Sequence, residues 1–120
     1  MRVKAIRGAT QLSVDNPVEM AEAVTELLSE LFTKNEIQKV DLISIFFTST
    51  GDLTSDFPAA AARTLDLGDI PLICAREIGV VGSLERVVRV MVHVHSDRSH
   101  EEIKHIYKRG AEVLRQDIAQ

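Results

Sequence analysis

An arginine lies in the middle of an apolar stretch, residues 86–94 of this chain. The stretch alternates with a period of two, so a strand here would place Arg89 on one face with Met91 and His93, and four valines on the other. A guanidinium on so apolar a strand is costly to bury unless an anionic group meets it. We therefore interpret Arg89 as a residue that is positioned to bind an anion.

Three more arginines lie in or beside the elements that the pattern predicts: Arg7, Arg63 and Arg115. Arginine binds carboxylates through two parallel hydrogen bonds, so several converging arginines would suit a substrate with two carboxylates. Taken singly, Arg63 and Arg115 are more simply interpreted as surface residues in ordinary ion pairs. For Arg7 the two interpretations stay open.

Three other side chains could bind a ligand or take part in chemistry. Glu77 follows the end of a predicted strand, where it could accept a hydrogen bond from a substrate hydroxyl or remain a solvated loop carboxylate. Tyr107, the only tyrosine, could donate to an anion or cap the core. Cys74, the only cysteine, is interpreted as a small core residue because no Cys/His pairing accompanies it.

Motifs for metal or cofactor chemistry are missing from the sequence. His93 and His95 would share a strand face, but no carboxylate or third ligand follows at a recognisable spacing. There is no glycine-rich phosphate loop, nucleophile elbow or dinucleotide fingerprint. We therefore expect no metal and no cofactor, only cationic and hydrogen-bonding groups around an anion.

Composition narrows the class of protein further. The chain has 120 residues, a formal net charge of -4 and no Lys/Arg run, so we expect one domain over residues 1–120 and no nucleic-acid partner. No apolar run approaches the ~20 residues that span a bilayer, so we expect no membrane segment. A single cysteine and the lack of a signal sequence favour a reducing, cytoplasmic location.

Alternation and β-branched residues predict four strands, at residues 3–12, 41–48, 70–74 and 86–95. Gly8, inside the first, indicates a bulge or a close approach of another backbone. The pattern does not decide whether residues 105–108 are helical or extended.

One long amphipathic helix is predicted to begin at Pro17, with Asn16 as its N-cap, and to end near Lys34. Its apolar stripe comprises Met20, Val24, Leu27, Leu28 and Leu31. Asn35 is expected to adopt the left-handed conformation just after the helix. Short helical segments are predicted at residues 58–63, after a capping box at Ser99, and at 111–114.

These elements predict an α+β domain, a mixed β-sheet covered by one long helix plus short helices. The long helix can cover only one face of the sheet. The other face, with Arg89, Met91 and His93, is too apolar for water and too polar for a dry core. We therefore expect a homo-oligomer with ligand sites near its interfaces.

The chain resembles the monofunctional, trimeric chorismate mutases of the pseudo-α/β-barrel class over nearly its whole length. The motifs that carry the resemblance are Ile6–Thr10, Asp52-Leu53 with Phe57-Pro58-Ala59 and Arg63, Pro71–Cys74 with Glu77, Gly82-Ser83-Leu84, Val88–Met91, and His105-Ile106-Tyr107 with Leu114-Arg115. It implies the Claisen rearrangement of chorismate to prephenate, in the biosynthesis of phenylalanine and tyrosine. It also implies a homotrimer with three active sites, each between two subunits.

The resemblance also implies roles for individual residues. Arg7 and Tyr107 would hold a substrate carboxylate, Arg89 would face the ether oxygen of the breaking bond, and Glu77 with Cys74 would bind the ring hydroxyl. The remaining substrate-binding positions would be Ile73, Phe57, Ala59 and Arg63, with Leu114 and Arg115 closing the pocket from a mobile C-terminal segment that begins near residue 115.

The sequence departs from the family pattern at three places. Ala60 stands where a lysine is frequent, Gln116 replaces a proline, and the link between Arg63 and Pro71 is one residue short. Two other functions remain open from the residues alone. One is a trimeric imino-acid deaminase, and the other is a non-catalytic module that binds an anionic metabolite.

Overall fold

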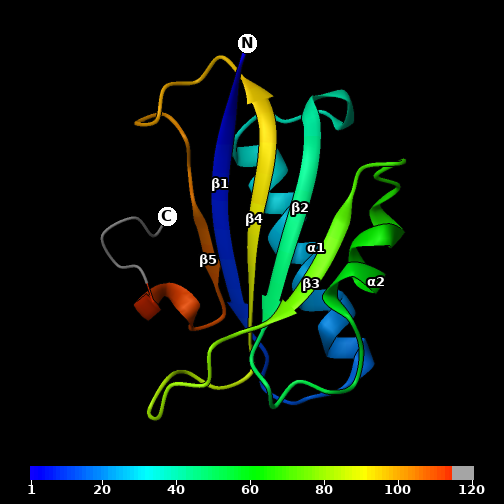
Figure 1. The fold of residues 1–120 in the computed structure, drawn as a ribbon, viewed down its shortest axis with the longest axis vertical. Coiled ribbons are helices and arrows are strands. Elements are labelled where there is room, and N and C mark those ends of the chain that lie inside the picture. Colours follow the sequence, from blue (N-terminus) through cyan, green and yellow to red (C-terminus); the bar gives the residue numbers. More distant parts are fainter. Residues whose placement is uncertain (115–120) are drawn as a thin grey trace.

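A five-stranded mixed sheet forms the centre of the protein in the computed structural model, which describes residues 1–114 (Figure 1). The strands are β1 (Arg2–Gln11), β2 (Leu42–Ser49), β3 (Leu72–Arg76), β4 (Val87–Ser96) and β5 (Ile106–Lys108), in the spatial order β3-β2-β4-β1-β5. β4 pairs antiparallel with both β1 and β2, whereas the outer strands β3 and β5 pair parallel with their neighbours. The predicted mixed sheet is confirmed, and residues 106–108 prove to be extended.

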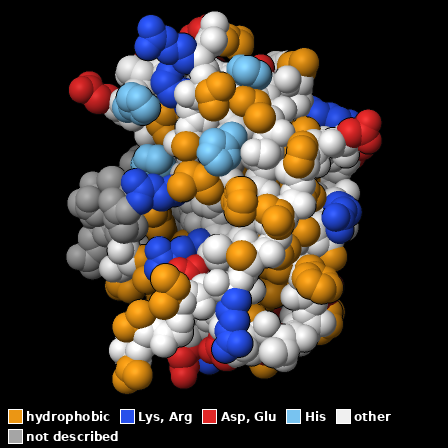
Figure 2. Space-filling model, in the orientation of Figure 1, with side chains coloured by type: hydrophobic (Ala, Val, Ile, Leu, Met, Phe, Trp, Pro, Cys, Tyr) orange, Lys and Arg blue, Asp and Glu red, His pale blue; other side chains and the backbone are white. Residues whose placement is uncertain are grey.

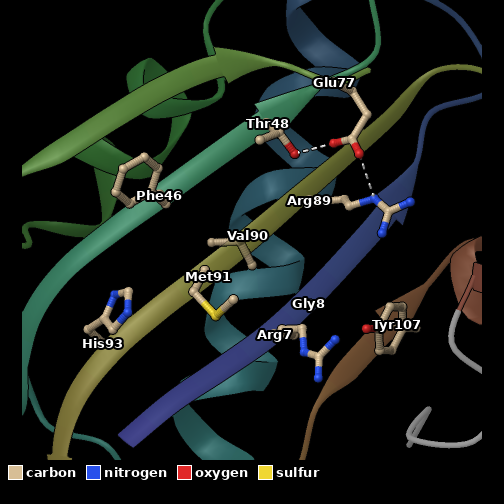
Figure 3. A pocket seen from close by; sticks show the side chains of 10 residues that line it. All are labelled: Arg7, Gly8, Phe46, Thr48, Glu77, Arg89, Val90, Met91, His93 and Tyr107. Atoms are coloured by element: carbon tan, nitrogen blue, oxygen red, sulfur yellow. Dashed lines mark hydrogen bonds and ion pairs between the residues drawn. The ribbon is translucent and has the colours of Figure 1, made fainter. Parts of the chain in front are cut away.

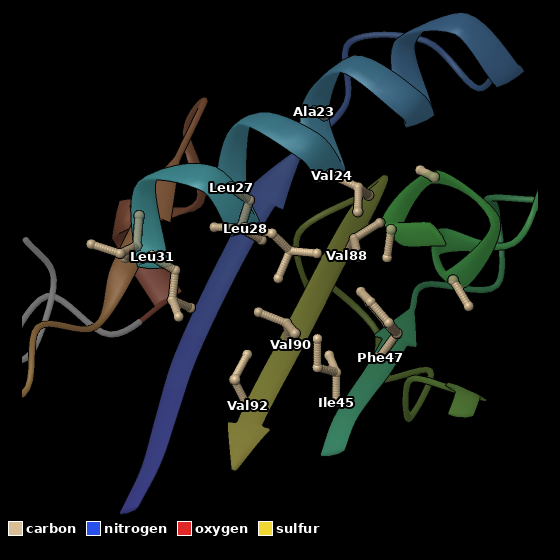
Figure 4. Close-up of a cluster of buried hydrophobic side chains, with 14 of the residues drawn as sticks. Ala23, Val24, Leu27, Leu28, Leu31, Ile45, Phe47, Val88, Val90 and Val92 are labelled. Carbon is tan, nitrogen blue, oxygen red and sulfur yellow. The ribbon is translucent and has the colours of Figure 1, made fainter. Parts of the chain in front are cut away.

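Helix α1 (Pro17–Lys34) covers one face of the sheet (Figure 1). It begins as predicted, because the Asn16 side-chain oxygen accepts a hydrogen bond from the Glu19 backbone N–H at 2.7 Å. The predicted apolar stripe is fully buried and packs against the inward side chains of β2 and β4 (Figure 4). Burial of this stripe stabilises the packing of α1 on the sheet.

The end of α1 differs from the prediction. Asn35 has a φ of -103°, and the left-handed residue is Glu36, with a φ of 54°. The Asn35 side chain is buried instead, where it donates to the carbonyls of Leu31 and Lys104 and accepts from the Lys104 N–H. The Asn35 side chain therefore connects the end of the helix to the segment before β5 by tertiary hydrogen bonds, which local capping rules do not predict.

The helix predicted after Ser99 does not form. Glu102 does accept a hydrogen bond from the Ser99 N–H at 2.8 Å, as a capping box requires, but only a turn results. Ile103 is buried directly after it and the Lys104 N–H binds Asn35, so the chain is drawn into β5 before a second turn can follow.

The other short helical segments occur near their predicted places. Helix α2 (Pro58–Ala62) continues into the 3-10 turn η2 (Arg63–Leu65), and η3 (Ala111–Leu114) follows β5. A further 3-10 turn, η1 (Lys39–Asp41), precedes β2. Within residues 1–114, no helix has the length and apolar character needed to cross a membrane.

Gly8 marks a close approach and not a bulge, since the pairing of β1 with β4 is continuous from Arg2 to Gln11. A Cβ at Gly8 would lie 3.0 Å from the carbonyl oxygen of Ile106 and 3.1 Å from side chains of Leu27 and Val90. Because glycine has no side chain, β5 can pair closely with β1 at this position. This pairing places Tyr107 next to the strand that carries Arg7.

The face of the sheet opposite α1, which we call the open face, carries the side chains of Arg7, Phe46, Arg89, Met91 and His93. The four valines of β4 point to the covered face and are buried, as the alternation predicts. Figure 2 views the open face, where apolar and histidine side chains gather above a hollow with basic side chains at its edge; the arginines that line it are Arg7 and Arg89. None of the described helices lies across the middle of this face (Figure 1).

Candidate active site

A hollow of about 490 Å³ lies on the open face (Figure 3). It is lined by Arg7, Gly8, Phe46, Thr48, Glu77, Arg89, Val90, Met91, His93 and Tyr107. The four residues predicted to be catalytic are thus all in its wall, although they come from β1, the segment after β3, β4 and β5. Its size is in the range of pockets for small molecules.

Strand pairing explains why these side chains meet. Ala9 of β1 is paired with Arg89 of β4 on one side and with Tyr107 of β5 on the other. Arg7 lies two residues from Ala9 on the same strand, so its side chain emerges on the same face. Three neighbouring strands therefore present Arg7, Arg89 and Tyr107 to one pocket.

The anionic partner that Arg89 requires is Glu77. The Arg89 Nε lies 3.3 Å from Glu77 Oε1, with the two side chains 41% and 24% exposed. The Nε is shielded from solvent but does not meet hydrogen-bond geometry with the carboxylate, so the two groups are held by charge. The terminal nitrogens of Arg89 point away from Glu77 (Figure 3).

Thr48 is a pocket residue that the sequence interpretation missed. Its hydroxyl donates a hydrogen bond to Glu77 Oε2, and it lies directly opposite Arg89 in the pairing of β2 with β4. Alternation within β2 could have shown that Thr48 shares a face with Phe46. Its place beside Glu77 and Arg89, however, depends on the register of three strands.

Arg7 and Tyr107 form the other side of the pocket. The phenol oxygen of Tyr107 points toward the Arg7 guanidinium (Figure 3), and the tyrosine is 4% exposed. Within residues 1–114, no carboxylate lies at ion-pair distance from Arg7, whose backbone N–H donates to His105 Nδ1 at 2.9 Å. The Arg7 side chain is therefore a cation without a counter-ion in the described part of the chain.

The pocket can accept an anion on electrostatic grounds. Two guanidinium groups face one carboxylate, while Phe46 and Met91 give an apolar wall. His93 lies at the far end, with Nδ1 3.4 Å from the hydroxyl of Ser44. No cluster of three metal-ligating side chains occurs among residues 1–114.

The other predicted substrate-binding residues lie elsewhere. Phe57 and Cys74 line a second hollow of about 440 Å³, and the Cys74 side chain packs against the core, as expected for a small core residue. Leu114 lines a third hollow of about 260 Å³, which Glu77 and Arg89 also border.

Three more predicted residues line none of these hollows. Ala59 is buried in the core, Arg63 is exposed at the end of α2, and Ile73 is 55% exposed on β3. Arg115 lies outside the described residues. One chain therefore does not bring Phe57, Ala59 or Arg63 to the pocket that holds Arg89.

The loop before α2 is held by a carboxylate. Asp15 accepts hydrogen bonds from the Thr54 N–H at 3.0 Å, the Thr54 hydroxyl at 3.1 Å and the Ser55 N–H at 3.2 Å. These bonds, that of the Thr54 N–H foremost, lower the pKa of Asp15 below its usual value. The loop leads directly to Phe57, which is 69% exposed.

Comparison with known proteins gives consistent matches. The family "Chorismate mutase type I" matches residues 3–118. Chorismate mutase AroH of Thermus thermophilus is 42% identical over 117 residues, 97% of this chain and 96% of that protein. The protein of the same name in Bacillus subtilis (strain 168) is 32% identical over 99% of this chain and 94% of its own length. A solved chorismate mutase structure from Clostridium thermocellum superposes with a TM-score of 0.89 and 45% identity, covering 92% of this chain and 98% of that one.

Proposed function

The chain belongs to the chorismate mutase type I family and is a chorismate mutase, an isomerase of aromatic amino acid biosynthesis. We propose that its reaction takes place in the pocket of the open face. The observation that carries the proposal is the convergence of two guanidinium groups, a phenol and a carboxylate in one hollow. The comparisons favour neither of the alternative functions, the imino-acid deaminase and the non-catalytic binding module.

Arg89 is the group we assign to the breaking bond. In a Claisen rearrangement one C–O bond breaks and one C–C bond forms within the same molecule, so no nucleophile, base or metal is needed. Negative charge develops on the ether oxygen, and a fixed guanidinium stabilises it better than reorganising water. The outward-pointing nitrogens of Arg89, backed by Glu77, suit this role.

The other pocket residues would hold the substrate in its compact, reactive conformation. Arg7, which has no carboxylate partner in the described chain, binds a substrate carboxylate together with Tyr107. Glu77 accepts a hydrogen bond from the ring hydroxyl. Such restraint can remove much of the entropic part of the barrier. The Cys74 side chain lines the second hollow and packs against the core, so we do not assign it to this contact.

We further propose that the chain acts as a homotrimer in the cytoplasm, as one domain over residues 1–120. The pocket lies on a face that no described helix crosses, and Phe57 and Ile73 are exposed apolar residues away from it. A second copy that brings the segment with Phe57, Ala59 and Arg63 over Arg89 would close the site and bury the exposed side chains of Phe57 and Arg63, with Leu114 and Arg115 at its rim.

Loss of chorismate absorbance with purified protein tests the activity directly. Chorismate is consumed and prephenate appears if the assignment is correct. Release of ammonia from imino acids with chorismate untouched would identify a deaminase. Saturable binding of a dicarboxylate without turnover would identify a binding module.

Complementation between two variants tests the shared site. Arg89→Ala and Arg63→Ala each remove a group from opposite sides of the proposed intersubunit pocket. A mixture of the two, allowed to exchange subunits, should regain part of the activity that each lacks, because some pockets then receive both intact sides. Light scattering should give three times the 13.3 kDa mass of one chain. No gain in activity, or a monomeric mass, would overturn the shared site.

A further inference from the structure

Thr48 hydrogen-bonds one of the two charged groups at this end of the pocket, Glu77, and is paired across the strands with the other, Arg89. Its hydroxyl donates to Oε2 of Glu77, while Oε1 of the same carboxylate faces Arg89 Nε at 3.3 Å. Each oxygen of the carboxylate thus has its own partner, one neutral and one cationic (Figure 3).

The two contacts differ in what they fix. The Arg89 Nε does not meet hydrogen-bond geometry, so the attraction there depends on charge and distance and only weakly on angle. The Thr48 hydroxyl makes a directional bond, and among residues 1–114 it is the donor that hydrogen-bonds this carboxylate. The orientation of the Glu77 carboxyl group is therefore set by Thr48.

The backbone holds Thr48 firmly enough for this task. β2 is an inner strand, where Thr48 is paired with Ala75 of β3 and with Arg89 of β4. The Glu77 N–H donates to the Ser49 carbonyl at 2.9 Å, so the glutamate begins its side chain at a fixed point one residue from Thr48. Both ends of the Thr48–Glu77 contact are consequently anchored in the sheet.

We propose that Thr48 is a positioning residue for the rearrangement: it fixes the Glu77 carboxylate, which in turn holds the Arg89 guanidinium with its terminal nitrogens toward the substrate. The inference rests on the proposed roles of Glu77 and Arg89. Thr48 acts through these two groups and not on the reacting atoms. If the Glu77 carboxylate lost its fixed orientation, Arg89 would keep its charge but its guanidinium would be misoriented. Stabilisation of the transition state would then fall more than the affinity for the substrate.

Thr48→Val and Thr48→Ser separate the hydroxyl from the rest of the side chain. Valine keeps the branched shape and removes the donor, whereas serine keeps the donor and removes a methyl group. We expect Thr48→Val to lower kcat about tenfold or more, as for loss of a hydrogen bond to a charged group, with a smaller rise in KM. Thr48→Ser should retain most of kcat.

Thr25→Val is the matched control. The Thr25 hydroxyl is hydrogen-bonded to the Ala21 carbonyl at 2.7 Å on α1, on the covered side of the sheet and away from the pocket. Thr25→Val replaces a threonine hydroxyl with a methyl group, as Thr48→Val does. Its kcat and KM should match those of the parent, which excludes a general effect of replacing a half-buried threonine hydroxyl.

A double-mutant cycle with Glu77→Ala tests the route of action. If Thr48 works through Glu77, adding Thr48→Val to Glu77→Ala should change kcat less than twofold. A full tenfold loss in both backgrounds would overturn the positioning role, as would a Thr48→Val enzyme with parental kcat beside an impaired Glu77→Ala enzyme. Parental activity in both Glu77→Ala and Arg89→Ala would instead overturn the proposed site itself, and the role of Thr48 with it.

Discussion

The two faces of the sheet are built from the same strands, yet they depend on different physics. The covered face is a closely packed apolar layer in which β4 contributes four valines and α1 contributes its apolar stripe (Figure 4). The open face carries charged and hydrogen-bonding side chains around a hollow (Figure 3). Because alternate residues of one strand serve the two faces, stability and chemistry can be separated by substitutions one residue apart.

Arg89→Ala is the substitution on the open face with the largest expected effect. Removal of a preorganised donor at a developing negative charge typically costs about 10²–10³ in rate, and we expect at least this loss in kcat. Arg89→Lys should recover only part of it, since lysine keeps the charge without the planar fork. Steady-state kinetics with chorismate measure both.

We expect substitutions on the open face to change the stability of the fold much less than substitutions on the covered face. Arg89 is partly exposed, so Arg89→Ala should leave the melting temperature near that of the parent. If turnover stayed within a few-fold of the parent, Arg89 would not face the breaking bond.

Leu28→Ala tests the covered face. Leu28 is fully buried in the stripe of α1, so its truncation should lower the free energy of unfolding by about 2–5 kcal/mol. Urea denaturation at one fixed protein concentration measures the loss. The kcat of the folded fraction should be unchanged, in contrast to Arg89→Ala. A large fall in kcat of fully folded Leu28→Ala protein would show that the two faces are not separable.

Asp15 gives the smallest expected effect, and it concerns the loop that leads to Phe57. The pKa of Asp15 is lowered in the folded state, so its contribution to stability is present above the pKa of the unfolded chain, near 3.8. That contribution is lost as the pH falls through the lower folded value. Asp15→Asn should therefore cause a small fall in melting temperature above about pH 5 and a smaller one in acid. An equal difference at pH 3 and pH 7 would contradict the role of the ionised carboxylate.

The sequence predicted what depends on neighbouring residues. The alternation of β4, the stripe of α1 and the cap at Asn16 are confirmed, because each is determined within a few positions of the chain. The prediction that Arg89 binds an anionic ligand also depends on one strand, through the cost of burying a guanidinium, whereas the nearby carboxylate of Glu77 is found only in the structure.

What the sequence could not predict depends on register between distant segments. Local capping rules predict a left-handed conformation for Asn35, but its side-chain amide instead binds the backbone of Lys104, 69 positions away. The capping hydrogen bond at Ser99 is present but no helix follows it, because the chain enters β5 a few residues later. Thr48 meets Glu77 across 29 positions, and nothing local to either residue shows this.

The junction between β1 and the start of β5 has one consequence for the side of the pocket that holds Arg7 and Tyr107. The Arg7 amide is received there by an imidazole nitrogen, His105 Nδ1, so the neutral ring must carry its hydrogen on Nε2. Protonation of Nδ1 would remove the lone pair that accepts the Arg7 N–H, and this hydrogen bond beside Tyr107 would be lost. One tautomer of His105 therefore supports the pairing that sets the spacing of Arg7 and Tyr107, the two groups proposed to bind the substrate carboxylate, and a nitrogen chemical shift would report that tautomer without any ligand bound.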